Sequence, residues 1–137
     1  RAFSAQNLKF ANLVENDVLS AMNAQGWSIP SLGVVDDSEL GGPALTTAAG
    51  DYGHLLLLGP ADPGWFTTPS TMPGALIEPL FITDPFEASL AESESGQHVI
   101  SAGLAQAVEQ YFAPPAGGKN SEKGKPRHHS SRQRAAA

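Results

Sequence analysis

One carboxylate stands inside a run that is otherwise typical of a buried strand. Glu78 is surrounded in the sequence by six apolar residues, Ala75, Leu76, Ile77, Leu80, Phe81 and Ile82. A charged side chain in such a run is costly unless it is paired, hydrated or bound to something. Desolvation at a strand end would suit this carboxylate to move protons as a general acid and base. The alternative is structural: Glu78 lies where the strand reaches solvent, or accepts a hydrogen bond from a neighbour.

Two other sets of residues have side chains that bind metals. Asp36, Asp37 and Glu39 lie close together in a loop-rich stretch, and three carboxylates suit a hard cation such as Ca²⁺. Their spacing does not match an EF-hand loop, and carboxylates in turns commonly hydrogen-bond the local backbone. His54 precedes four leucines. In one interpretation it is a zinc ligand, and in the other its ring is hydrogen-bonded to backbone groups. For both the acidic cluster and His54 we favour a structural role over metal binding.

The segment around Glu78 continues into a helix start. Pro73-Gly-Ala-Leu-Ile-Glu78 is followed by Phe81 and then by Thr83-Asp-Pro-Phe-Glu87. This pattern resembles the C-terminal signature of the zinc-dependent N-acetylmuramoyl-L-alanine amidases of the amidase_3 type. Their signature has Pro-Ala, two aliphatic residues, Glu, any residue, Gly and Phe, then Ser/Thr-Asn-Pro-x-Glu. The family's catalytic glutamate falls on Glu78.

The chain departs from the family signature at three positions. Pro79 follows the glutamate directly, Leu80 replaces the glycine before the phenylalanine, and Asp84 replaces the usual asparagine. The first two change the backbone beside the glutamate. Asp84 caps a helix as well as asparagine does.

The resemblance extends over residues 3–112 and implies a peptidoglycan hydrolase. Such an enzyme cleaves the amide bond between N-acetylmuramic acid and L-alanine, outside the cytoplasm, with zinc as its cofactor. The family's His, Glu and His zinc ligands lie N-terminal to the matched region and have no counterpart here, so we expect no metal ligand in this chain. The chain begins at Arg1 without a methionine. We therefore expect the C-terminal part of a longer enzyme whose activity needs upstream residues.

Helical periodicity marks two long segments and one short one. Ser4 is expected to cap a helix that Gly26 ends, with Leu8, Ala11, Val14, Val18 and Met22 on its core face and Glu15 among its solvated residues. Asp84 and Pro85 are typical of a second helix start, with Glu87 completing a capping box. A last helix is expected from about Ser95 to Phe112. Its predicted core residues are Ile100, Leu104, Ala107, Val108 and Tyr111.

Two short apolar runs, residues 54–58 and 75–78, are expected to be strands. Strands between helices predict an α/β fold, a layered mixed or mostly parallel sheet flanked by helices. The connection between the two runs carries Trp65 and Phe66, whose rings are candidates for stacking on a sugar or for closing the core.

Charge divides the chain into two regions. Residues 1–113 have thirteen acidic and two basic residues, a net charge of −11, whereas residues 114–137 have six basic and one acidic residue, a net charge of +5. We expect one folded domain over residues 1–113 and a disordered basic tail over residues 114–137. The acidic domain would repel phosphates, which argues against a nucleic-acid partner. No apolar run is long enough to span a membrane.

A second function remains open. Pro79 and Leu80 stand where the family has other residues, and they favour a non-catalytic cell-wall-associated binding domain that kept the fold without the metal site. The sequence leaves the oligomeric state undetermined.

Overall fold

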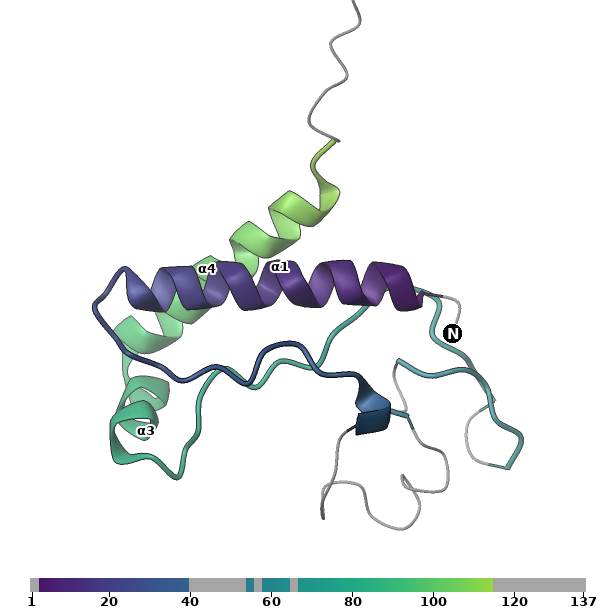
Figure 1. The fold of residues 1–137 in the computed structure, drawn as a ribbon, viewed down its shortest axis with the longest axis horizontal. Coiled ribbons are helices and arrows are strands. Elements are labelled where there is room, and N and C mark those ends of the chain that lie inside the picture. The colour runs from purple at the N-terminus through teal and green to yellow at the C-terminus, as the bar shows by residue number, and fades with distance from the viewer. Residues whose placement is uncertain (1–2, 40–53, 56–57, 65–66, 115–137) are drawn as a thin grey trace, which may run out of the picture.

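Two long helices cross and form the core of the computed structural model, which describes residues 3–39, 54–55, 58–64 and 67–114 (Figure 1). Helix α1 spans Ser4–Asn23 and helix α4 spans Glu94–Phe112. The short helix α3, Pro85–Glu92, precedes α4, and a 3₁₀ turn, η1, spans Asp37–Glu39. None of the helices in these described ranges is long and apolar enough to cross a membrane.

The contact between α1 and α4 is close because one residue at the crossing has no side chain. A Cβ atom on Gly103 of α4 would lie 2.8 Å from the Cα atom of Val18 on α1. The two backbones therefore approach each other directly at this point. Around it lie the buried residues Val14, Val18, Met22 and Ala107, with Ile100 and Leu104 packed against them.

The sequence located the end of α1 better than its start. Ser4 is not the cap: the N-cap is Phe3, which makes no side-chain capping bond, and its carbonyl accepts the Asn7 N–H at 2.7 Å. The prediction that Gly26 ends the helix is confirmed. Gly26 has φ of +79°, and the N–H of Trp27 donates to the carbonyl of Met22 at 3.4 Å, as in a Schellman turn.

The short helix α3 begins as its sequence predicts. The Asp84 side chain accepts hydrogen bonds from the N–H groups of Phe86 and Glu87, and Pro85 occupies the first turn. Ser93 ends α3 and caps α4 by accepting from the N–H of Gly96. The last helix thus starts one residue before the predicted position, and it ends at Phe112 as expected.

The predicted layered α/β fold is wrong for the described residues, which form helices and extended segments without a sheet. In the first predicted strand, residues 54–58, the N–H of Leu58 donates to the carbonyl of Leu55 at 3.0 Å, which is a turn. Leucine favours helical backbone at least as well as strand backbone. The second predicted strand, residues 75–78, is extended but pairs with no described neighbour.

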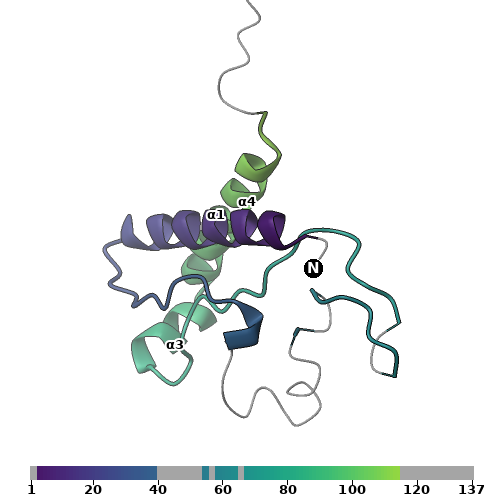
Figure 2. The ribbon, with the colours of Figure 1, turned by 45° about the vertical axis from the view of Figure 1, so that its right-hand side comes forward.

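Two extended segments, residues 27–36 and 70–81, replace the sheet. They run side by side beneath α1 in opposite directions, as Figures 1 and 2 both show. Pro30 and Gly33, which has φ of +74°, interrupt the first segment, and Pro73 and Pro79 lie in the second. Proline lacks the N–H donor of a strand ladder. These residues explain in part why the two segments do not pair.

Two predictions concern residues outside the described ranges. They are those for the aromatic pair Trp65 and Phe66 and for nearly all of the basic tail. Each stays a prediction.

Candidate functional site

A cavity of about 610 Å³ lies between α1 and the two extended segments. Its wall on the helix side is mostly apolar, and Leu8, a predicted core residue that is 57% exposed, belongs to it. The opposite walls come from residues 29–37 and 74–81. Two candidates that are far apart in the sequence, Glu78 and Asp37, are both among its lining residues.

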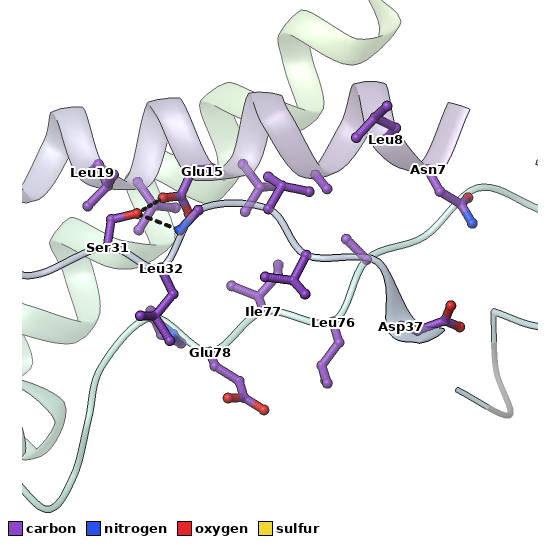
Figure 3. A pocket seen from close by; sticks show the side chains of 18 of the residues that line it. Asn7, Leu8, Glu15, Leu19, Ser31, Leu32, Asp37, Leu76, Ile77 and Glu78 are labelled. Atoms are coloured by element: carbon purple, nitrogen blue, oxygen red, sulfur yellow. Dashed lines mark hydrogen bonds between the residues drawn. The ribbon is translucent and has the colours of Figure 1, made fainter. Parts of the chain in front are cut away.

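Two side chains of α1 hold the extended segments against the helix. The Asn7 side chain accepts a hydrogen bond from the N–H of Gly74 at 3.0 Å. The hydroxyl of Ser31 donates to the carboxylate of Glu15 (Figure 3). The interpretation of Glu15 as a merely solvated residue was therefore incomplete, because its role depends on a residue that only the fold brings near.

Glu78 projects from the second extended segment into solvent. Figure 3 shows Ile77 directed toward α1, and Leu76 and Glu78 on the side away from it. This alternation is that of a β-strand. The Glu78 side chain is exposed, and its carboxylate has no hydrogen-bond partner among the described residues. The Glu78 carboxylate is therefore accessible to solvent.

Glu87, the other acidic residue of the motif, has the opposite environment. It is only 5% exposed, and its Oε2 atom accepts the N–H of Phe81 at 2.7 Å. In a capping box, the Glu87 carboxylate would accept the N–H of the N-cap residue Asp84. In the structure it accepts the N–H of Phe81 instead. Glu87 is a structural carboxylate that ties the end of the extended segment to α3.

Two of the three departures from the family signature, Pro79 and Leu80, have clear structural roles. Leu80 is half-buried and packs against the core formed by α1 and α4. A glycine at this position would leave part of that surface open. Pro79 removes one N–H donor from the segment and restricts its φ angle. Both residues fix the extended segment next to Glu78 and do not themselves supply a chemical group.

Asp37 and His54 form the second polar group near the cavity. Asp37 is 6% exposed, and its Oδ1 atom lies 3.3 Å from Nδ1 of His54. Its Oδ2 atom accepts the N–H of Leu55 at 3.0 Å. The carboxylate therefore links η1 to the following turn, as expected of an acidic residue in a turn. We expected backbone groups as the partners of His54, whereas the contact seen here is with the carboxylate of Asp37.

A metal ion does not fit the described residues. They contain no group of three or more His, Cys, Asp or Glu side chains placed to hold one. Asp37 and His54 provide two donor side chains, and Glu78 stands apart from them on another segment (Figure 3). The zinc of the family resemblance would need ligands from elsewhere.

Comparisons with protein-family models, with curated proteins and with solved structures gave no match for this chain.

Proposed function

We propose that this chain is the C-terminal part of an N-acetylmuramoyl-L-alanine amidase in which Glu78 is the general acid and base. The observation that carries the proposal is the contrast between the two glutamates of one motif. Glu87 is buried and engaged in a backbone hydrogen bond. Glu78 is exposed beside a large cavity and makes no hydrogen bond in the described part of the chain.

The proposed reaction is hydrolysis of the amide that joins N-acetylmuramic acid to L-alanine. The carboxylate of Glu78 takes a proton from a water molecule, whose oxygen attacks the carbonyl carbon. The carbon–nitrogen bond then breaks, and Glu78 returns the proton to the leaving amine. The products are the carboxylic acid on the muramic acid and the free amino group of L-alanine. An exposed carboxylate without a structural partner is available for both transfers.

The zinc ion that the resemblance implies would be bound by residues outside the described part of this chain. When bound, zinc polarises a carbonyl group and activates water. The His, Glu and His set implied by the resemblance would be upstream of Arg1. The chain would then contribute the carboxylate and the cavity wall, and its location would be the periplasm or the cell wall.

The test is peptidoglycan hydrolysis by the full-length protein and its Glu78→Gln variant. Glutamine keeps the size of the side chain and cannot take up the proton. Release of L-alanine amino groups should fall by about 100- to 10,000-fold, the usual contribution of a general acid–base group. Mass spectrometry of the products should show cleavage between muramic acid and L-alanine.

Glu109→Gln is the matched control, because Glu109 is an exposed glutamate on α4 and does not line the cavity. Its hydrolysis rate should equal that of the unmodified protein. Unchanged hydrolysis in Glu78→Gln would refute the assignment of Glu78. Absence of any amide cleavage by the unmodified full-length protein would refute the amidase proposal itself.

One observation favours a second candidate, the non-catalytic wall-associated binding domain. Glu78 is hydrated in this structure, and large apolar side chains such as Leu32, 79% exposed, lie open at the same cavity. An open apolar surface is typical of binding sites. In that case the full-length protein binds isolated cell walls, leaves their amide bonds intact, and binds them equally well after Glu78→Ala.

A further inference from the structure

The backbone of residues 75–80 is extended and has no hydrogen-bond partner in the described part of the chain. At one end the N–H of Gly74 is bonded to Asn7, and at the other the N–H of Phe81 is bonded to Glu87. Between them, no backbone group of residues 75–80 is bonded to any described residue. Pro79 has no N–H to offer, but the residues before it, 75–78, keep both N–H and C=O groups, and extended backbone of this kind is a template for another strand.

Residues 75–80 are anchored at both ends, so their backbone is already ordered for such pairing. The side-chain bonds of Asn7 and Glu87 fix its two ends to α1 and α3. Ile77 and Leu80 pack against the helical core, while Leu76, 59% exposed, points away from α1 with Glu78 (Figure 3). A strand that joins a preformed and anchored segment loses less conformational entropy than one that must order its partner as well.

The charged side chains that line the cavity indicate which kind of partner would fit it. Four charged side chains line it, and all four are carboxylates: Glu15, Asp36, Asp37 and Glu78. No lysine or arginine is among its lining residues. Opposite charges on neighbouring strands stabilise their pairing, and like charges destabilise it. The partner should therefore carry a basic side chain next to Glu78 and apolar side chains toward the cavity.

From this geometry we infer that residues 75–80 bind an extended polypeptide segment of another protein by β-strand addition. The segment alternates apolar side chains, which enter the cavity beneath α1, with basic side chains, which lie beside Leu76 and Glu78. Its backbone pairs with the free N–H and C=O groups of residues 75–80. This inference is independent of amide hydrolysis and concerns recognition alone.

Charge and composition disfavour two other occupants. A second copy of the chain would bring another Glu78 to the contact and add like charge to a cavity lined by carboxylates. The basic tail, residues 114–137, has the right charge, but its only nonpolar residues are alanine, proline and glycine. Such residues cannot fill an apolar cavity. A basic segment with large aliphatic side chains meets both requirements.

The experiment uses the 137-residue chain and a synthetic ten-residue peptide that alternates valine and lysine. Amide hydrogen exchange is measured at residues 75–80 with and without the peptide, and affinity is measured by titration. Peptide binding should slow exchange by at least about tenfold, which corresponds to about 1.4 kcal/mol, at the alternate residues of 75–78 whose N–H groups face the added strand. Methylating alternate peptide nitrogens removes backbone donors and keeps every side chain. It should weaken binding by at least about tenfold.

Two matched changes test the side-chain part of the inference. Leu76→Lys should weaken peptide binding, because it puts a like charge beside the peptide lysines, whereas Met72→Lys, at an exposed residue outside the cavity lining, should not. A peptide with glutamate in place of lysine should bind at least about tenfold more weakly, since like charges repel.

Several results would overturn the inference. One is binding that the N-methylated peptide retains in full, which would indicate an apolar ligand site without strand pairing. Another is protection of the amides of residues 75–80 that appears without peptide and grows with protein concentration. That result would show that a second copy of the chain pairs with the segment. Failure of the valine–lysine peptide to bind or to protect these amides would refute strand addition.

Discussion

Glu78 and Glu87 belong to one short motif, and their surroundings separate them. The carboxylate of Glu87 accepts the N–H of Phe81 at 2.7 Å from a buried position. The carboxylate of Glu78 meets solvent and has no partner among the described residues. The sequence indicated the structural role of Glu87 through the capping pattern. It left two interpretations of Glu78 open, desolvated or exposed to solvent, because flanking residues do not show which side of an extended segment is covered.

The cap of α3 gives a first prediction about stability. Asp84→Ala removes the acceptor of two N–H groups at the start of α3. Because these donors would lose their protein partner, the free energy of unfolding should fall by about 1 kcal/mol. Chemical denaturation measures this change. Asp84→Asn is the control, since asparagine is an equally good cap and should leave stability within about 0.5 kcal/mol. Equal losses in both variants would contradict the capping role.

The helices could be located from sequence because their signals are local. Gly26, Asp84 and Pro85 act on the residues beside them, and the apolar spacing of α4 is read over a few turns. The core face was less certain: Val108 was predicted inside and is 42% exposed. The sheet was wrong because a strand needs a paired neighbour, and no described segment pairs with residues 75–78. The link between Asp37 and His54 also depends on contacts that no local pattern contains.

The crossing of α1 and α4 gives a second prediction. Gly103→Ala adds a Cβ atom 2.8 Å from the Cα atom of Val18 and 3.0 Å from the carbonyl oxygen of Asp17. Both are backbone atoms, so the helices must move apart. Overpacking against two backbone atoms should cost up to about 3 kcal/mol, and the better helix propensity of alanine returns about 1 kcal/mol, so the free energy of unfolding should fall by about 1–2 kcal/mol.

Ala105→Ser, at an exposed position of α4, is the control for the Gly103 variant. It adds an atom in open solvent and should change stability by no more than about 0.5 kcal/mol. Thermal unfolding followed by circular dichroism compares the two variants. A Gly103→Ala protein as stable as the unmodified chain would show that the helices do not touch closely at this point.

Large apolar side chains lie exposed at the cavity in the described part of the molecule. Leu32, Leu76 and Leu8 are all more than half exposed, and all three line the cavity. We therefore expect the isolated chain to bind a hydrophobic dye in its native state. Leu32→Lys should reduce dye binding, and Met72→Lys, outside the cavity, should reduce it less. A monomeric preparation that binds no dye and melts sharply would contradict this expectation.

The most direct measurement for the account as a whole combines hydrolysis and thermal unfolding in two variants of the full-length protein. Glu78→Gln should lose amide hydrolysis by about 100- to 10,000-fold and keep its melting temperature, because its carboxylate bonds to no described residue. Glu87→Ala should lose about 1–2 kcal/mol of stability, because the N–H of Phe81 loses its acceptor. If Glu78→Gln instead lowers the melting temperature and leaves hydrolysis unchanged, Glu78 is a structural residue and the proposed function is wrong.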